Sequence, residues 1–464
     1  MNWKLNNHNK TNMRKKLNII LFFVLSVALF ACNNQPQAVQ SKSVVQPEWA
    51  EDAVLYEVNI RQYTPEGTFN AFAEHLPRLK ELGVEILWIM PVNPISEKNR
   101  KGSLGSYYSI ADYTAVNPEF GTMDDFKNLV AKCHKMGFKV IIDWVANHTG
   151  WDNHWITEYP EWYTADSLGN IIPPVADWSD VADLNYDVPQ MRRAMIDAMD
   201  FWLEETDIDG FRCDVAWGVP QDFWEAARAS FDSIKPAYML AEDEDHPAFL
   251  EKAFQSNYAW KLHHLMNDVA QGKQTASVFK NYFTEAEGKY MPGSFPMQFI
   301  TNHDENSWQG TIAERMGAAG DAFAVFSFTI PGIPLIYSGQ EAGLSKRLLF
   351  FEKDEIDWNN LEKQKFYKKL VDLKTGNKAL WNGDAGGDFK IPETTSGNAF
   401  CFVRERGKSK VLAIFNFSSE ESSVGFSLPE GGTFINYFSG EKEKLDTQLM
   451  VEMPAWGYKI YIQN

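Results

Sequence analysis

The chain has 464 residues, a formal net charge of −18, 16 Trp and four Cys. This acidity argues against nucleic acid or an anionic lipid surface as a partner, because phosphate groups and the chain would repel each other. The cysteines, at positions 32, 133, 213 and 401, are widely spaced, which excludes a disulfide framework and a cysteine metal motif.

Residues 1–31 have the pattern of a signal peptide. A basic start precedes an apolar run over 17–30 that is too short to span a membrane comfortably. The run ends in Leu29-Phe30-Ala31-Cys32, which resembles the lipobox of a bacterial lipoprotein signal and implies cleavage before Cys32 and lipid attachment to its thiol. The alternative is an ordinary secretory signal with an incidental cysteine. The leader holds five Lys and Arg and no acidic residue, so its removal takes the net charge from −18 to −23.

The next segment, 32–48, is polar, contains Gln, Ser and Pro, and predicts a flexible tether. With the lipobox it predicts a protein held in the cell envelope by a lipid anchor. No aspartate follows Cys32 in Asn33-Asn34, which favours the outer membrane. The periplasmic and the surface face both stay open.

From residue 54 onward, strand and helix patterns alternate. Strands are predicted over 54–60, 86–92, 139–145, 210–216, 238–242, 258–262, 297–304 and 335–339. Helices are predicted over 69–82, 122–136, 190–205, 221–234, 247–255, 275–287, 318–329 and 361–375. About eight such units predict an α/β fold, a closed parallel (β/α)8 barrel over 49–380. A doubly wound open sheet is the alternative, but no glycine-rich phosphate loop follows the first strand.

Two regions depart from the alternation. Residues 146–187 contain four Trp and a Pro-Pro pair without a sustained period, which predicts an inserted subdomain after the third strand. From residue 387 to 464, short strand patterns such as 399–404, 411–417 and 457–462 alternate with turns and predict an all-β C-terminal domain. The many Trp are a weak indication of carbohydrate, because sugar rings pack on flat indole faces.

The segment 209–216 places charges in a strand. Arg212 and Asp214 are two residues apart, so on a strand they point to the same face, where a buried charge needs a partner. They form either a structural ion pair or a catalytic pair in which Arg212 lowers the pKa of Asp214 and keeps it ionised as a nucleophile.

Other polar residues also stand where strands end. In a parallel barrel these ends meet at one mouth, which would gather Asp143, His148, Asp214, Glu242 and the pair His303-Asp304. Three carboxylates without a Cys or His metal cluster suit retaining glycoside cleavage, which needs an ionised nucleophile and a protonated acid. Asp214 suits the nucleophile, and Glu242, after two apolar residues, suits the acid. Asp304 can bind sugar hydroxyls and stabilise the transition state.

Four motifs resemble those of the alpha-amylase family, glycoside hydrolase family 13. They are DWVANH (143–148), GFRCDVA (210–216), LAED (240–243) and FITNHD (299–304). The supporting segments 105–122, 182–186 and 332–341 also match, and the resemblance spans 54 to about 345. It implies a barrel, an insertion after the third strand and a C-terminal antiparallel β-sandwich.

The resemblance also implies roles for individual residues. Asp214 would be the nucleophile, Glu242 the acid/base and Asp304 the stabiliser. Arg212 would orient Asp214, and Asp143 would support the site from behind. The residues that would bind the sugar in the cleaved subsite are Tyr108, His148 and His303.

The chain departs from the family at several positions. Trp217 and Gly218 stand where many members have a lysine and a histidine, and Ala241 stands where glycine is common. Asn147 and Asp183 match two calcium positions, so a structural calcium is possible, although the chemistry needs no cofactor. Whether calcium binds stays open.

The sequence thus predicts a lipid-anchored, retaining α-glucan hydrolase that cleaves α-1,4 bonds of starch or maltooligosaccharides. A transglycosidase or isomerase of the same family is one alternative, because it shares the covalent intermediate. An inactive glucan-binding lipoprotein is the other. Endo or exo action and chain-length preference stay open.

Overall fold

The computed structural model describes residues 44–428 and 430–463, within the compact unit Ser43–Asn464. The predicted signal peptide, the predicted lipidation site Cys32 and most of the predicted tether lie outside the described residues. No helix of the described part is long and apolar enough to cross a membrane. Residues 44–48, the end of the predicted tether, differ from expectation. Val44 is buried and the side chain of Gln255 donates to the carbonyl of Val45, so these residues pack against the barrel.

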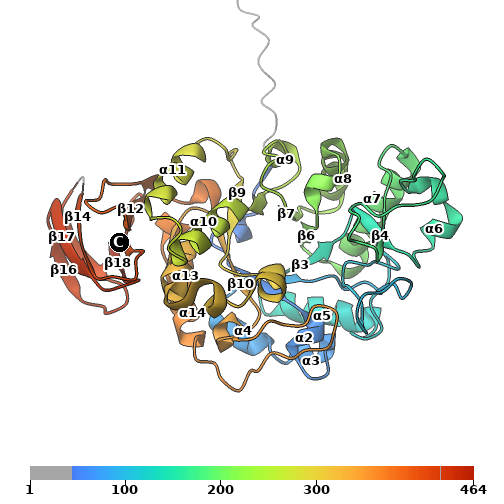
Figure 1. Cartoon of the computed structure of the whole chain (residues 1–464), viewed down its shortest axis with the longest axis horizontal. Helices are drawn as coiled ribbons and strands as arrows, with labels where there is room; N and C mark the ends of the chain where they lie inside the picture. The colour runs from blue at the N-terminus through green and yellow to red at the C-terminus, as the bar shows by residue number, and fades with distance from the viewer. Residues whose placement is uncertain (1–43, 429, 464) are drawn as a thin grey trace, which may run out of the picture. The chain divides into compact units, whose positions relative to one another are not determined.

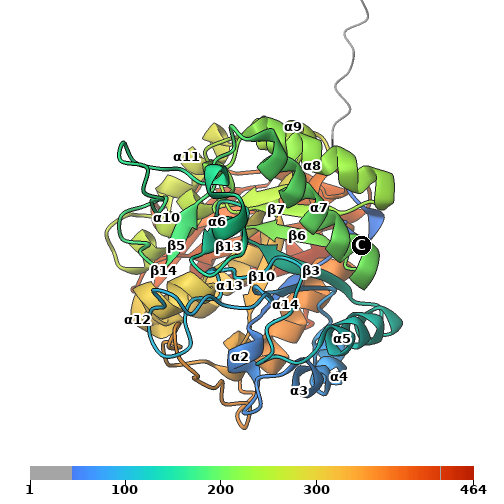
Figure 2. The ribbon, with the colours of Figure 1, turned by 90° about the vertical axis from the view of Figure 1, so that its right-hand side faces the viewer.

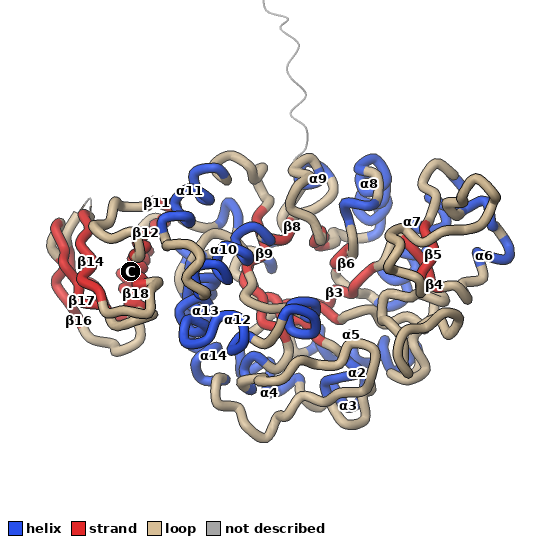
Figure 3. The backbone as a smooth tube through the Cα atoms, viewed as in Figure 1, coloured by secondary structure: helices blue, strands red, loops and turns tan. Residues whose placement is uncertain are grey.

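Eight parallel strands close into a barrel in the order β1-β2-β3-β6-β7-β8-β9-β10, with β10 pairing back onto β1. Figure 1 labels β3, β6, β7, β9 and β10 of this barrel, and Figure 3 draws its strands in red. The strands are β1 (Leu55–Val58), β2 (Ile86–Ile89), β3 (Lys139–Trp144), β6 (Gly210–Cys213), β7 (Tyr238–Ala241), β8 (Ser256–Tyr258), β9 (Phe295–Gln298) and β10 (Ile333–Tyr337). The predicted (β/α)8 barrel is confirmed, and an open doubly wound sheet is excluded because the sheet has no edge.

Alternate residues of the barrel strands fill its interior with apolar side chains. Leu55, Ile86, Trp88, Ile141, Tyr238, Leu240, Met297 and Leu335 belong to one fully buried cluster. Because the barrel is packed in this way, its chemistry is confined to the mouth where the strands end.

Helices surround the strands, as Figure 2 shows for α5, α7, α8 and α9 around β3, β6 and β7. The helices are α2 (Ile60–Tyr63), α3 (Phe69–Ala73), α4 (Leu76–Leu82), α5 (Met123–Lys135), α6 (Trp155–Glu158), α7 (Pro189–Thr206), α8 (Gln221–Ile234), α9 (Phe249–Lys252), α10 (Trp260–Ala270), α11 (Ser277–Glu285), α12 (Ile312–Met316), α13 (Gly320–Thr329) and α14 (Gln364–Gly376). Thr122 caps α5 through a capping box with Asp125.

Several predicted elements were wrong in part, and the strands predicted over 54–60 and 210–216 end early, at Val58 and Cys213. The helix predicted over 69–82 is two helices, α3 and α4. Pro77 lies in the first turn of α4, where a proline is tolerated, and it cannot continue α3 because it has no backbone N–H. The strand over 297–304 ends at Gln298, and a π-helical turn, η4 (Glu305–Gln309), follows Asp304. The strand over 258–262 is β8 only up to Tyr258, since Trp260 begins α10. Short apolar runs do not distinguish a strand from a buried helix.

The inserted subdomain contains the antiparallel pair β4 (His148–Gly150) and β5 (Val181–Asp183). In this pair His148 lies opposite Asp183. Tyr113 donates its hydroxyl hydrogen to the carbonyls of Val145 and His148, which fixes the insertion to the end of β3.

The C-terminal region is all-β and antiparallel, as predicted. One sheet has the order β11-β12-β13-β18-β15-β16, and β14 pairs with β17. The strands are β11 (Asp388–Lys390), β12 (Ala399–Arg406), β13 (Ser409–Asn416), β14 (Ser422–Ser427), β15 (Gly432–Asn436), β16 (Lys442–Leu445), β17 (Gln448–Met453) and β18 (Tyr458–Gln463). Phe326 of α13 packs on Phe400 and Phe417, which joins the barrel to this domain.

Candidate active site

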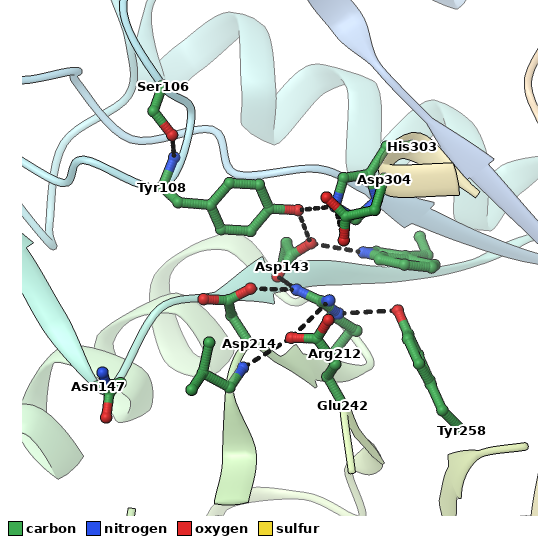
Figure 4. A network of polar contacts seen from close by, with 12 residues as sticks. Ser106, Tyr108, Asp143, Asn147, Arg212, Asp214, Glu242, Tyr258, His303 and Asp304 are labelled. Carbon is green, nitrogen blue, oxygen red and sulfur yellow. Dashed lines mark hydrogen bonds and ion pairs between the residues drawn. The ribbon is translucent and has the colours of Figure 1, made fainter. Parts of the chain in front are cut away.

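Arg212, in β6, is fully buried and lies between three carboxylates (Figure 4). Its Nη1 donates to Asp143 Oδ1 at 2.8 Å and to Asp214 Oδ1 at 2.9 Å, and its Nη2 lies 3.0 Å from Glu242 Oε2. Its Nε donates to the hydroxyl of Tyr258 at 3.1 Å. The structure therefore brings Asp214 and Glu242 together on one guanidinium, as the strand-end pattern predicted.

The turn after β6 places the backbone N–H of Val215 against the Glu242 carboxylate. Val215 has a φ of 44°, in the left-handed region, which is costly for a β-branched residue. In that conformation its N–H donates to Glu242 Oε2 at 2.8 Å. The N–H of Glu242 donates in turn to the carbonyl of Cys213 at 3.0 Å. The ends of β6 and β7 thus hold the Glu242 carboxylate beside Asp214.

Burial raises the pKa of both Asp214 and Glu242. The charge of Glu242 raises the pKa of Asp214 further, and Arg212 lowers it. The expectation that Arg212 makes the pKa of Asp214 low was wrong in its net direction, because burial is the larger effect. Since the two carboxyls are neighbours, they titrate as a coupled pair.

Tyr108 and Asp143 form the adjoining part of the site. The Tyr108 hydroxyl donates to Asp143 Oδ2 at 3.0 Å and lies 2.8 Å from His303 Nε2, and the two rings are stacked at 21°. Asp143 also accepts from the indole of Trp88 at 3.2 Å and is fully buried. Its oxygens are occupied by protein donors, which agrees with a supporting role rather than a reacting one.

His303 and Asp304 complete the group. His303 Nδ1 lies 2.5 Å from Glu57 Oε1, and its Nε2 lies 3.3 Å from Asp304 Oδ2. Burial lowers the pKa of His303, but the charges of Asp304 and Glu57 outweigh it and raise the pKa to about 9. The Asp304 side chain is 35% exposed, so it can meet a ligand.

Glu57 was missed by sequence reasoning. It is fully buried in β1, where all four residues are buried, and its carboxylate contacts His303 Nδ1. A single acidic residue inside the apolar run 54–60 was the available signal, since a buried carboxylate needs a partner.

His148 lies at the start of β4, and its ring is 5.7 Å from that of Trp178. Burial lowers its pKa to about 4, so the imidazole is neutral near pH 7. A neutral imidazole can both donate to and accept from a sugar hydroxyl.

The residues matched to calcium positions supply few ligands. Asn147 offers an amide oxygen and Asp183 a carboxylate whose pKa is raised by burial. Among the described residues there is no group of three or more His, Cys, Asp or Glu that could hold a metal. Calcium takes about six to eight oxygen ligands, so these two side chains alone do not form its site.

Family models match most of the chain. The model described as "Alpha amylase, catalytic domain" matches 28–167 and 175–386, and "Alpha amylase, C-terminal all-beta domain" matches 393–456. The chain is 28% identical over 416 residues to alpha-amylase MalA of Haloarcula japonica, covering 85% of this chain but only 59% of that protein. It is 26% identical to a cyclomaltodextrinase of Thermoanaerobacter pseudethanolicus, covering 90% of this chain and 77% of that one.

Solved structures agree with these relatives. A maltogenic alpha-amylase, AmyB of Thermotoga neapolitana, superimposes with a TM-score of 0.81 at 28% identity, covering 89% of this chain and 98% of that chain. An alpha-amylase of Lactobacillus plantarum has a TM-score of 0.80 at 29% identity, with 89% and 99% coverage. The barrel, the C-terminal sheets and both family models therefore show that this chain belongs to the alpha-amylase family of glycoside hydrolases.

Proposed function

We propose that this protein is a retaining α-glucan hydrolase that cleaves α-1,4 bonds of starch or maltooligosaccharides. The observation that carries the proposal is the Asp214–Glu242 pair on one buried guanidinium, with Tyr108, His303 and Asp304 beside it. The names of the relatives support the substrate class, since they are alpha-amylases, cyclomaltodextrinases and a neopullulanase.

The reaction would proceed in two displacements. Glu242 gives its proton to the glycosidic oxygen while an Asp214 oxygen bonds to C1, and the leaving sugar departs as an alcohol. Glu242, now ionised, takes a proton from water, whose oxygen bonds to C1 and releases Asp214. Each displacement inverts C1, so the anomeric configuration is retained.

The other residues would bind the sugar whose bond is cleaved. The Tyr108 ring offers a stacking face, and His148, His303 and Asp304 offer hydrogen bonds to its hydroxyls. His303 carries a positive charge near pH 7, which strengthens a hydrogen bond to a hydroxyl oxygen.

The test is to incubate the purified protein with maltopentaose and to record the products by proton NMR before they mutarotate. The proposal expects α-configured reducing ends, and β-configured products would contradict it. Products longer than the substrate, increased by added glucose, would favour the transglycosidase alternative. Binding without turnover would favour the inactive glucan-binding alternative.

We also propose that Cys32 carries a lipid that anchors the protein in the cell envelope, on the outer membrane. The support is the lipobox-like sequence at 29–32 and the polar segment after it. Cys32→Ser should move the protein from the membrane fraction to the soluble fraction with its activity intact. Unchanged membrane association would contradict the anchor.

A further inference from the structure

A cavity of about 270 Å³ lies between α12, α13, the start of α14 and the loop after β10. Helix α13 packs against both α12 and α14 (Figure 3). Asp214, Glu242 and Asp304 do not line this cavity, so it is distinct from the place where the glycosidic bond is cleaved. Sites for drug-sized ligands have volumes of about 300–1,000 Å³, so this smaller cavity suits a single small ring.

The buried wall of the cavity carries a hydroxyl without a partner. Thr301 lines the cavity and is 3% exposed, and its Oγ1 has no hydrogen-bond partner among the described residues. Tyr367 is also buried there, and its hydroxyl oxygen accepts from Gln340 Nε2 at 2.8 Å. A buried hydroxyl that is left unpaired costs free energy, so a ligand that bonds to Thr301 would recover it.

Small residues form the outer wall of the cavity. Ala313, Gly317, Ala318, Gly343 and Ser345 all line it and are exposed. Apart from chain neighbours and the residues' own helix backbone, no atom lies within 4 Å of a Cβ added at Gly317 or Gly343. A small molecule can therefore enter from solvent without displacing a large side chain.

The charges on the lining balance each other. Of the described residues that line the cavity, only Asp321 and Lys363 are charged, and Lys363 Nζ donates to both Asp321 oxygens, at 2.9 and 2.7 Å. An ionic ligand would have to compete with this pair, whereas a neutral ligand would not. The rings of Tyr337 and Tyr367, together with the hydroxyl of Thr301, suit a neutral ring that carries hydroxyl groups.

We propose that this cavity binds one free neutral hexose, at a site separate from the residues that cleave the glucan. A smaller polyol such as glycerol would leave part of the cavity unfilled and would lose contacts with its walls. Segment 301–306 connects the two places, because Thr301 and Asn306 line the cavity while His303 and Asp304 belong to the active site. The hexose site does not depend on the proposed function, because binding needs no turnover.

Methyl NMR of the full chain would detect binding at this place, because Ile312 lines the cavity. The variant Ile312→Val identifies the Ile312 signal by its loss. In the wild-type protein D-glucose should shift this signal saturably, with a Kd of about 1–10 mM, as expected for a ligand of twelve or so heavy atoms.

Two variants test the cavity itself. Ala318→Leu adds a larger side chain to the lining and should weaken glucose binding by more than about tenfold. Thr301→Val keeps the shape of the side chain but removes its hydroxyl, and it should weaken binding about three- to tenfold. The matched control is Ala226→Leu, because Ala226 is exposed on α8 and does not line the cavity. It should leave the Kd unchanged.

The site would be overturned if the Ile312 signal did not shift at about 100 mM D-glucose, some ten times the highest Kd expected. The wild-type Kd in both Ala318→Leu and Thr301→Val would also overturn it. Glycerol that bound as tightly as D-glucose would contradict the assignment to a hexose. Hydrolysis of maltopentaose is measured separately, so failure of the proposed function would leave these outcomes as they are.

Discussion

Glu57 Oε1 lies 2.5 Å from His303 Nδ1, which connects the first barrel strand to the segment after the seventh. Both side chains are buried, and neither strand neighbours the other in the barrel. The contact makes an interior carboxylate a support for an imidazole at the mouth. A substitution of Glu57 in β1 should therefore change the properties of His303 in the active site.

Glu57→Gln should lower the pKa of His303 from about 9, because it removes one of the two charges that raise it. A raised pKa stabilises the folded protein below the ordinary value of 6.5, and this stability is lost as the pH rises through about 9. In the variant the loss should occur at lower pH. Histidine NMR and melting temperatures between pH 6 and 10 would measure both effects.

The matched control is Glu81→Gln, an exposed glutamate on α4. It should leave the His303 titration where it is. An unchanged pKa of His303 in Glu57→Gln would mean that the Glu57 carboxylate, at 2.5 Å, does not stabilise the protonated form of His303.

Arg212→Met should lower the free energy of unfolding by about 3–5 kcal/mol, since it leaves buried carboxylates without their cation. Urea unfolding followed by circular dichroism would measure it. Arg193→Met is the control, because Arg193 is 63% exposed beside Asp197 and such pairs contribute less than about 1 kcal/mol. Equal midpoints for Arg212→Met and wild type would contradict the central place of Arg212.

Gly210→Ala should disrupt the junction of β6 and β7. Gly210 has a φ of 149°, and a Cβ there would lie 1.9 Å from the carbonyl oxygen of Tyr238. We expect a loss of about 3 kcal/mol in unfolding free energy and a large loss of activity, because these strands carry Arg212 and lead to Glu242.

Gly376→Ala, at the end of α14, should change neither property, because apart from its chain neighbours and its own helix backbone no atom lies within 4 Å of the added Cβ. Wild-type stability in Gly210→Ala would show that the strands can move apart at no cost.

Much of the site could be predicted from sequence because a closed parallel barrel brings the ends of its strands together at one mouth. Asp214 and Glu242 are 28 residues apart in the chain, yet both contact Arg212 because β6 and β7 pair in parallel. Glu57 escaped prediction because a strand pattern does not show which side chain from a distant part of the chain will contact an interior acid.

Other features depend on quantities that the sequence does not contain. The net direction of the pKa of Asp214 follows from burial, which the Arg212–Asp214 spacing does not reveal. The left-handed Val215 breaks a local preference, and the surrounding fold imposes it. The end of β9 was misplaced because the apolar pair Phe299-Ile300 continues the strand pattern beyond the ladder.

The most direct test of the central claim is to trap the sugar on Asp214. In Glu242→Gln, α-maltosyl fluoride needs no proton for departure, so the glycosyl-enzyme should form and then break down slowly. Mass spectrometry of the intact protein and of its peptides should find one maltosyl group on Asp214, and azide should release it as the α-azide. A label on another residue, or release as the β-azide, would contradict the account.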